Sequence, residues 1–249
     1  MKKQNVHITK IENFTNLPTH IAFILDGNRR WAKQRKKTIN FGHKQGIKNI
    51  ENICNFCKKY GIKYLTLYCL STDNLNRSEL ELKFLFNCMK RYFTLQNLKK
   101  IHDNDINIKI VGDFSLIPND VAQLIENINK QQIKSKKLNV QICISYSGKN
   151  EILNGIKNIV KQIKNNLVDL EKLEKINEKQ FEKYIFTGDF PDVDLMIRTG
   201  GDIRISNFLL WKLSYAEFYF CKTYFPSFSE KHFLYALHVF QKRKRRYGK

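Results

Sequence analysis

The chain has 249 residues, 44 Lys and Arg against 23 Asp and Glu, a formal charge of +21, and 42% apolar side chains. This length suits one domain with a sizeable core. No uncharged stretch approaches the roughly 18 residues that a membrane span needs, and Met1 to Pro18 holds no apolar run typical of a secretory signal. Six cysteines without regular spacing are typical of reduced core residues in a cytosolic protein. Composition therefore argues against a membrane-spanning, a disulfide-stapled and a fully disordered protein.

Short β-branched or aromatic runs alternate along the chain with longer stretches of helical periodicity. Strands are expected at His20–Leu25, Tyr64–Leu70, Ile106–Val111, Leu138–Ser145, Val193–Ile197 and Ala216–Phe220. Helices are expected at His43–Tyr60, Ser78–Ile101, Pro118–Lys134, Lys149–Asn165, Glu178–Tyr184 and Ser229–Lys242. This alternation predicts an α/β fold, a single domain with a central, mostly parallel, six-stranded sheet and helices on both faces.

The arginines are more informative than the lysines. We interpret the Lys surplus, which accompanies abundant Asn and Ile, mainly as compositional background on a solvated surface. Arg is scarce, and nine of the ten arginines form four clusters: Arg29, Arg30 and Arg35; Arg77; Arg198 and Arg204; and Arg243, Arg245 and Arg246. Because guanidinium offers a planar, bidentate fork for phosphate oxygens, these clusters predict oxyanion binding.

Three of the four clusters fall in loops that follow predicted strands, at residues 26–31, 71–77 and 198–207. Ligands of parallel α/β sheets bind outside the carboxyl ends of the strands, so these loops should meet at one edge. In the first loop, Asp26-Gly27 allows a tight turn into a helix start that favours phosphate, and the Asp26 carboxylate can hold Mg²⁺ against it. The alternative for this loop is an Asx turn with an exposed basic helix face.

The third loop, Arg198-Thr199-Gly200-Gly201, resembles a phosphate-cradling turn, with further donors nearby on Arg204 and Ser206. The alternative is a purely structural turn.

Other motifs are missing from the sequence, namely a Walker loop, GxGxxG, GxSxG and HExxH. We interpret Cys54 and Cys57 as core residues rather than a redox or zinc pair. Three acids around Pro191 are interpreted as turn residues rather than a metal site: Asp189, Asp192 and Asp194.

The expected helix Ser78–Ile101 is apolar beyond one face. Burial on two sides explains this pattern in most proteins. The alternative is a helix that packs on the core with one face and lines an apolar ligand channel with the other. An arginine-rich pocket beside such a channel would suit an amphiphile with a diphosphate head and a hydrocarbon tail.

At these loops the sequence closely resembles the cis-prenyltransferases, the family of undecaprenyl and dehydrodolichyl diphosphate synthases. The resemblance is carried by residues 20–32, Gly42-His43-x-x-Gly46, Leu67-Tyr68-x-x-Ser71-x-x-Asn74-x-x-Arg77, and residues 197–211 followed by Tyr215-Ala216-Glu217. It covers the chain as one domain, residues 18–249, after an amino-terminal extension, residues 1–17. As in the family, no DDxxD pair occurs, which separates the chain from the trans-prenyl synthases.

The resemblance implies elongation of a farnesyl-like allylic diphosphate by isopentenyl diphosphate, with each new double bond in cis. The product would be a long-chain polyprenyl diphosphate for a glycosyl-carrier lipid of the dolichol or undecaprenol type. The helix Ser78–Ile101 becomes the wall of a hydrophobic tunnel that receives the growing chain.

The resemblance also assigns residues to these roles. The allylic diphosphate is expected on Gly27, Asn28, Arg29 and Arg30, with His43 and Arg77 nearby. Isopentenyl diphosphate is expected on Arg198, Arg204 and Ser206. Mg²⁺ is expected on Asp26 and Glu217, and proton loss near Asn74 or Asp26. The other substrate-contacting positions that the resemblance implies are Trp31, Ser71, Thr72, Asp73, Leu75 and Ile205.

The sequence departs from the family pattern at four positions. Ile39 stands where an Arg is usual, and Arg35, Lys36 and Lys37 are candidates to replace its charge. Asp73 stands in place of Glu, Leu75 in place of an aromatic residue, and Ile203 where bacterial relatives often have His. The main acidic and basic residues of the pattern are retained, so we expect activity with altered substrate affinity.

The terminal Arg246-Tyr247-Gly248 matches the family's Arg-x-Gly element, which reaches the active site across a dimer interface. Arg246 and Gly248 are therefore expected to be contributed by the partner copy of a self-sufficient homodimer. The alternative is a frayed basic tail that touches anionic lipid.

Two other functions compete with this interpretation. A nucleic-acid-binding protein would interleave basic residues with exposed aromatics, whereas these arginines lie in loops beside acids, so we expect no nucleic-acid partner. A catalytically silent partner subunit would lack the phosphate-binding residues of the first loop, which are intact from Asp26 to Arg30. We expect a cytosolic enzyme in loose peripheral contact with the membrane that takes its product.

Overall fold

The computed structural model describes residues 15–133, 135, 137–167 and 173–244. Its helices are α1 (Asn28–Gln34), α2 (Ile39–Lys59), α3 (Glu79–Tyr92), α4 (Leu95–Asp103), α5 (Asn119–Lys130), α6 (Gly148–Lys164), α8 (Glu178–Phe181) and α9 (Glu230–Gln241). Its strands are β1 (His20–Ile24), β2 (Tyr64–Ser71), β3 (Ile106–Val111), β4 (Leu138–Tyr146), β5 (Leu195–Arg198) and β6 (Glu217–Phe220).

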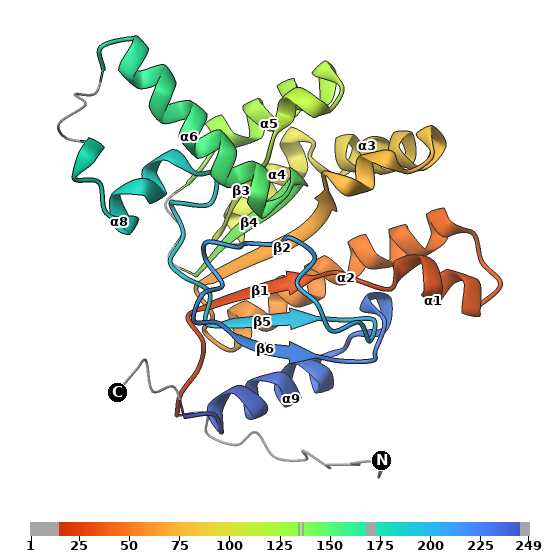
Figure 1. The fold of residues 1–249 in the computed structure, drawn as a ribbon. Coiled ribbons are helices and arrows are strands. Elements are labelled where there is room, and N and C mark those ends of the chain that lie inside the picture. The colour runs from red at the N-terminus through yellow and green to blue at the C-terminus, as the bar shows by residue number, and fades with distance from the viewer. Residues whose placement is uncertain (1–14, 134, 136, 168–172, 245–249) are drawn as a thin grey trace.

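The strands form one six-stranded sheet in the order β3-β4-β2-β1-β5-β6, and every neighbouring pair is parallel (Figure 1). The predicted α/β fold is confirmed, and each strand lies within two residues of its predicted bounds. Parallel neighbours bring all carboxyl ends to the same edge. The loops after β1, β2 and β5, which are central neighbours, therefore meet there.

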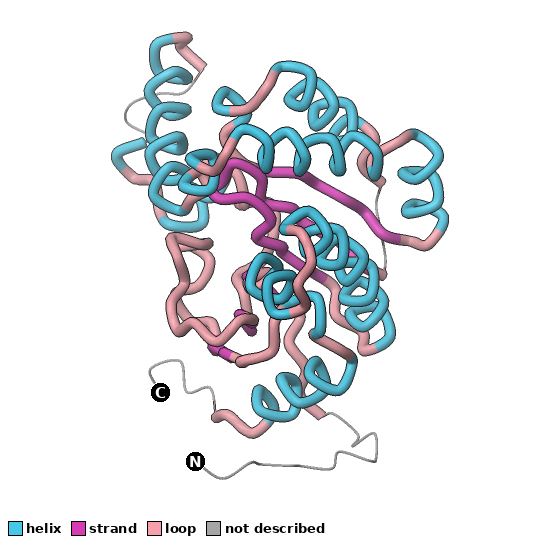
Figure 2. Tube along the Cα trace, turned by 90° about the vertical axis from the view of Figure 1, so that its right-hand side faces the viewer, coloured by secondary structure: helices cyan, strands magenta, loops and turns pink. Residues whose placement is uncertain are grey.

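Side chains alternate between the two faces of the sheet, as the strand pleat requires. Ile21 and Phe23 of β1 point into a core shared with α2, α3, α4, α5 and α9. Ala22 and Ile24 point into a second, smaller core. That face is covered largely by the irregular segment after β5, whose Phe208 is fully buried. Figure 2 shows loops gathered on one side of the strands and helices on the other in the lower half of the molecule. The helix cover is therefore less even than the expected helices on both faces.

The prediction of one continuous helix from Ser78 to Ile101 was wrong, because the chain breaks between α3 and α4. The Thr94 side chain caps α4 by accepting a hydrogen bond from the Asn97 backbone N–H at 3.3 Å. The Asn97 side chain in turn donates to the Tyr92 carbonyl, at the end of α3, at 2.9 Å. These two caps outweigh the helical periodicity of the apolar residues, since each satisfies a backbone group that a helix end leaves open.

Within the part of the chain that the structure describes, no helix is long and apolar enough to cross a bilayer. The same residues contain no group of three or more side chains arranged as a metal site.

Cys57 is fully buried and Cys54 packs beside the first core, in agreement with their interpretation as core residues. The three acids around Pro191 are dispersed: Asp189 pairs with Lys109, Asp192 with Lys212, and Asp194 accepts from backbone N–H groups.

Candidate active site

The chain turns sharply where β1 ends. This turn places the amino-terminal end of α1 at the edge of the sheet where the carboxyl ends of the strands lie. Gly27 has φ +109°, which side-chain-bearing residues rarely adopt, and a Cβ there would lie 2.6 Å from the Tyr224 ring. Glycine is therefore required at this turn. The helix α1 starts at the next residue and carries no acid in its first turn, while Arg29 and Arg30 lie in it. The free N–H groups and the two guanidinium groups make this helix start attractive to an anion.

The helix α2 lies unusually close to α1, and this contact positions His43. A Cβ at Gly42 would lie 2.3 Å from the Asn28 carbonyl oxygen, so only glycine permits this approach. His43, the next residue, is thereby buried beside the turn, with 7% of its surface exposed. The Gly-His motif of the sequence thus has a structural cause as well as a place in the site.

Asp26 lies between two arginines at the centre of this edge. Its carboxylate accepts hydrogen bonds from Arg30 at 2.8 Å and from Arg198 at 3.0 Å. Burial raises the pKa of Asp26, but the bonds from Arg30 and Arg198 outweigh burial and hold the pKa below its usual value. Asp26 is therefore an ionised, weakly basic carboxylate at neutral pH.

A second carboxylate, Asp202, joins the same charge cluster. It pairs with Arg198 at 3.4 Å, with Arg204 at 2.5 Å and with Arg30 at 3.7 Å. Arg198 also donates to the Ser206 hydroxyl at 2.8 Å. Its side chain is 4% exposed, and its Nε has no hydrogen-bond partner among the described residues. A buried N–H donor without a partner is costly unless a ligand supplies one.

Glu81 of α3 gathers a second set of cationic or polar side chains on the opposite wall. The carboxylate, 7% exposed, accepts from His43 Nε2 at 3.0 Å and from Arg77 at 3.1 Å, with Arg29 at 4.0 Å. Burial lowers the pKa of His43 even though Glu81 opposes this shift, so the ring is neutral near pH 7 with its proton on Nε2. Burial also lowers the pKa of Arg77.

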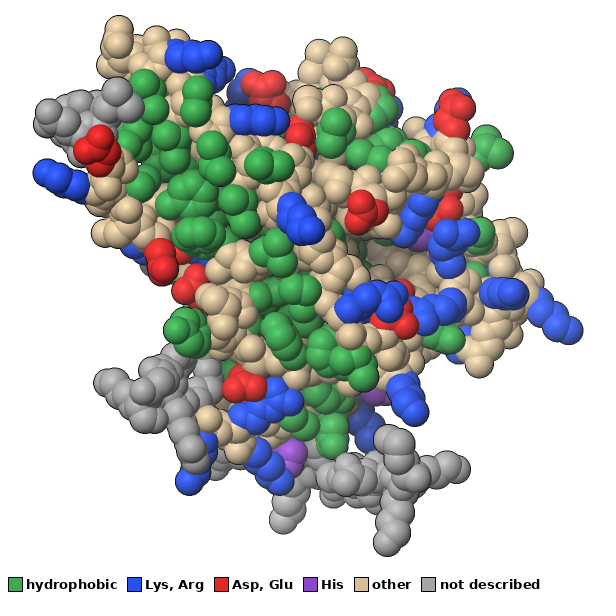
Figure 3. Space-filling view, viewed as in Figure 1, with side chains coloured by type: hydrophobic (Ala, Val, Ile, Leu, Met, Phe, Trp, Pro, Cys, Tyr) green, Lys and Arg blue, Asp and Glu red, His purple; other side chains and the backbone are tan. Residues whose placement is uncertain are grey.

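Between the two clusters lies a polar cleft of about 600 Å³. Figure 3 shows Lys and Arg side chains gathered around this hollow at the right of the molecule. The cleft brings together thirteen of the residues that the sequence assigned to the site: Asp26, Gly27, Asn28, Arg29, Arg30, His43, Ser71, Asp73, Asn74, Arg77, Arg198, Arg204 and Ser206. In the loop after β2, Asn74 and Ser71 fix each other through reciprocal side-chain to backbone hydrogen bonds of 3.1 and 3.4 Å.

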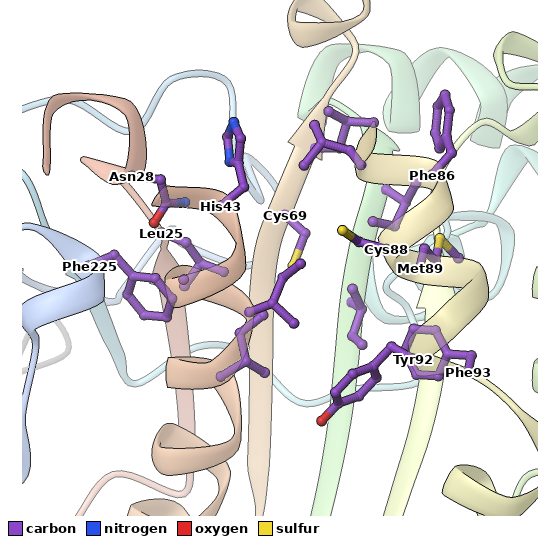
Figure 4. Close-up of a pocket in the computed structure, with 17 residues that line it drawn as sticks. Leu25, Asn28, His43, Cys69, Phe86, Cys88, Met89, Tyr92, Phe93 and Phe225 are labelled. Carbon is purple, nitrogen blue, oxygen red and sulfur yellow. The ribbon is translucent and has the colours of Figure 1, made fainter. Parts of the chain in front are cut away.

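An apolar pocket of about 150 Å³ adjoins the cleft, between α2 and α3 above strands β2 and β4 (Figure 4). The cleft and the pocket share five lining residues, so they are continuous: Leu25, Asn28, His43, Cys69 and Leu85. The α3 residues lining the pocket include Phe86 and Met89, which belong to the apolar surplus noted in the sequence. The arrangement can receive a molecule with an anionic head and an apolar tail.

Four of the proposed substrate contacts do not line the cleft. Trp31 stacks on Phe41, with ring centroids 6.0 Å apart, and donates to Ser227. Leu75 packs against the first core and Ile205 against the second. Thr72 donates its backbone N–H to the Tyr146 carbonyl at 3.1 Å. Their place in this structure is to support the loops rather than to form the cleft wall.

Glu217, the second proposed magnesium ligand, is not brought to Asp26 within one chain. It begins β6 in register with Leu195, at the amino end of β5, whereas Asp26 follows Ile24, which is in register with Arg198. Along the strand direction, Glu217 and Ile24 are therefore three residues apart, which corresponds to about 10 Å. Glu217 instead accepts a hydrogen bond from Arg243 at 2.6 Å. Within the described part of the chain, this register therefore keeps the two proposed magnesium ligands apart, and sequence spacing does not reveal it.

The proposed replacements for the arginine missing at Ile39 do not line either cavity. Arg35 lies over the Trp31 ring at 4.2 Å, and Lys36 and Lys37 are exposed. Arg246 and Gly248 lie outside the described residues.

Sequence reasoning missed Glu81 and did not assign a role to Asp202. For Glu81 a signal existed, since it lies four positions after Arg77 at the start of an expected helix, where side chains meet. For Asp202 the signal was its position between two arginines in a glycine turn.

Comparisons with known proteins show which family the chain resembles over nearly its whole length. The family model described as putative undecaprenyl diphosphate synthase matches residues 24–248. A tritrans,polycis-undecaprenyl-diphosphate synthase (geranylgeranyl-diphosphate specific) of Pyrococcus abyssi is 38% identical over 94% of this chain and 88% of that protein. A chloroplastic (2Z,6Z)-farnesyl diphosphate synthase of Solanum lycopersicum is 38% identical over 98% of this chain and 84% of that protein.

Among solved structures, lavandulyl diphosphate synthase from Lavandula x intermedia, in complex with dimethylallyl diphosphate, has a TM-score of 0.85. It is 32% identical, and the match covers 94% of this chain and 99% of that chain.

Proposed function

Since this chain belongs to the cis-prenyltransferase family of undecaprenyl diphosphate synthases, enzymes of cis-prenyl chain elongation, we propose that it condenses isopentenyl diphosphate repeatedly onto a farnesyl-like allylic diphosphate. The product would be a long-chain polyprenyl diphosphate that serves as precursor of a glycosyl-carrier lipid of the dolichol or undecaprenol type. The observation that carries this proposal is the continuity of the arginine-lined cleft with the apolar pocket. Relatives differ in the primer and product that their names state, so family membership alone does not give either one.

We place the two diphosphates on opposite walls of the cleft. The allylic diphosphate would bind at the start of α1, on Gly27 to Arg30, with His43 and Arg77 beside it. This placement lets its hydrocarbon tail enter the pocket, because His43 lines both cavities. Isopentenyl diphosphate would bind to Arg198, Arg204 and Ser206, where the unpartnered Nε of Arg198 offers a donor.

The residues present fit a metal-assisted diphosphate site of the kind that family membership implies. Mg²⁺ usually binds one or two carboxylates and completes its shell with substrate phosphates and water. Asp26 meets this requirement, and Asp202 lies close by, since both accept from the same Nη2 of Arg198. When bound, the ion would neutralise charge on the departing diphosphate. We propose Asp26 as the principal ligand.

In the proposed reaction the allylic C1–O bond breaks, and its electron pair leaves with the diphosphate. The C4 carbon of isopentenyl diphosphate then bonds to C1, and one proton leaves C2 to form the new double bond. Arg29, Arg30 and the N–H groups of α1 would stabilise the leaving oxygens in a fixed geometry. Asn74 or Asp26 would lie next to the proton loss, and the low pKa of Asp26 makes it a weak base.

The test is incubation of purified protein with farnesyl diphosphate, labelled isopentenyl diphosphate and Mg²⁺, followed by extraction and sizing of the labelled lipid. We expect long-chain product, reduced roughly 10²- to 10³-fold by Asp26→Ala, since a charge-stabilising group at the reacting centre is lost. Asp189→Ala is the matched control, because Asp189 is a 70% exposed carboxylate paired with Lys109 away from the cleft. Absence of labelled lipid, or undiminished product from Asp26→Ala, would refute the proposal.

We also propose that the enzyme is a homodimer. The helix α6 exposes Leu153, Ile156 and Val160 by 55%, 49% and 44%, at positions that share one helix face. Figure 3 shows hydrophobic side chains gathered at the upper left, where α6 lies. A second copy covering this face would remove the apolar surface from water.

Peripheral membrane contact is proposed at the connection between α1 and α2. The exposed basic residues are Lys33, in the last turn of α1, and Arg35, Lys36 and Lys37, which follow it. Residues 27–50 contain no acid. Such a cluster attracts anionic lipid over a Debye length. Salt-sensitive flotation with vesicles of anionic but not neutral phospholipid would support this contact.

A further inference from the structure

The apolar pocket is spanned by two hydrogen bonds between α2 and α3, one near each end. Near the cleft, His43 Nε2 donates to Glu81 at 3.0 Å. At the far end, the Tyr92 hydroxyl donates to Glu51 Oε1 at 2.8 Å. Glu81 and Tyr92 are eleven positions apart on α3, which corresponds to about 16 Å along the helix. Figure 4 shows His43 and Tyr92 at opposite ends of the pocket.

Tyr92 closes the far end with its ring as well as its hydroxyl. The ring lines the pocket and meets Phe93 edge-on, with centroids 5.4 Å apart. Burial, followed by the bond to Glu51, raises the pKa of the Tyr92 hydroxyl, so it remains a donor. Glu51 is exposed, so the bond connects a ring that lines the apolar pocket to a carboxylate in contact with water.

The helix α3 ends at Tyr92, and the chain breaks before α4 begins at Leu95. The end of α3 is therefore not held in place by a continuing helix. The Asn97 side chain holds the Tyr92 carbonyl and Phe93 is buried in the first core, while the bond from Tyr92 to Glu51 is the hydrogen bond that ties this end of α3 to α2 across the pocket.

The present pocket is too small for a long chain. Its volume is about 150 Å³, and a dry cavity of about that size holds one benzene-sized molecule. The pocket itself therefore accepts on the order of one five-carbon unit, and the remainder of a farnesyl-like tail would lie where the pocket opens into the cleft. A longer tail requires α2 and α3 to separate, and the advancing end of the chain would press on the Tyr92 ring.

The geometry points to the Tyr92–Glu51 hydrogen bond as a determinant of product length, which resists separation of α2 and α3 and so limits how far the hydrocarbon chain extends. This inference rests on the proposed function. Neither residue touches the diphosphate cleft, so their effect is on when elongation stops rather than on the bond-forming step.

The test compares product length distributions under one set of substrate concentrations. Tyr92→Phe keeps the ring and removes the donor, and Glu51→Ala removes the acceptor. Each should shift products toward longer chains by one or more five-carbon units, with little change in the rate of the first condensation. The double variant should shift no further than either single variant, because both remove the same bond. Glu51→Gln keeps an acceptor oxygen and should restore the distribution of the unmodified protein.

Tyr60→Phe is the matched control. Tyr60 also donates to a carboxylate from the end of α2, to Glu230 at 2.6 Å, but it lines neither cavity. Its product lengths should be unchanged.

Unchanged lengths in folded Tyr92→Phe and Glu51→Ala, or an equal shift in Tyr60→Phe, would overturn the inference. A shift in Glu51→Gln as large as in Glu51→Ala would also overturn it. These outcomes are separate from failure of the proposed function, which would appear as absence of product from the unmodified protein.

Discussion

Glu81 provides a sharp test of how the cationic wall of the cleft is held together. Glu81→Gln keeps one acceptor oxygen and removes the negative charge. Arg29 is 54% exposed and 4.0 Å away, so its pairing contributes little. Both close bonds, from His43 and from Arg77, are accepted by Oε1, so Gln keeps both acceptor positions but removes the charge that strengthens each bond. A hydrogen bond to a charged group is worth about 1.5–3 kcal/mol and a neutral one about 0.5–1.5 kcal/mol, so two weakened bonds give an expected loss of about 2 kcal/mol.

For a chain of this size, that loss corresponds to a fall in Tm of about 4–8 °C. Urea unfolding at pH 7 measures the free energy directly, and an unchanged m-value keeps the comparison valid. Glu126→Gln is the matched control, because Glu126 is an exposed carboxylate paired with Lys130 on α5, and it should be indistinguishable from the unmodified protein.

A second measurement connects this cluster to the ligand. Inorganic diphosphate supplies the anion that Arg77 loses in Glu81→Gln, so it should raise Tm more in this variant than in the unmodified protein. A destabilisation below about 0.5 kcal/mol, or equal ligand-induced shifts in both proteins, would refute the view that Glu81 and the diphosphate share these cations.

Three further predictions concern the rest of the molecule. Arg198→Lys loses the bidentate fork, so kcat/KM for isopentenyl diphosphate should fall roughly 10- to 100-fold with little change in KM for the allylic substrate; equal effects on both would contradict the assigned subsite. Ile156→Lys should convert the dimer to a monomer in light scattering, and a surviving dimer would exclude the α6 face as the interface. Burial lowers the pKa of His20 from 6.5 to about 4, so stability is full above pH 6.5 and is lost as pH falls through 4. The loss should reach about 2 kcal/mol by pH 5 in urea unfolding, and His20→Gln should reduce it; an equal loss in that variant would assign the pH dependence to other groups.

Much of the fold was predictable because its signals are local. Alternating apolar runs such as Ile21 to Leu25 and the turn residues after them depend on a few neighbouring positions, and they gave the strands to within two residues. Parallel topology then placed three arginine clusters at one edge, since all carboxyl ends point the same way. The cleft residues from Asp26 to Arg30 could be proposed on this basis alone.

The errors arose where distant groups compete with local pattern. The apolar periodicity continues past Tyr92, but the caps supplied by Thr94 and Asn97 end one helix and begin another. Glu217 was assigned to the magnesium ion by family resemblance, and the register of β6 places it near the opposite end of the strands from Asp26.

The strands, the turn glycines and the arginine loops of this protein follow from local sequence, because each depends on covalent neighbours and on backbone conformations that few residues adopt. Three other features depend on how the whole chain packs: Glu81 binds Arg77 and His43, Asp26 and Asp202 share Arg198, and Tyr92 reaches Glu51. Charge pairing and cavity shape depend on distances across the fold, and those distances are set only when helices and sheet pack together.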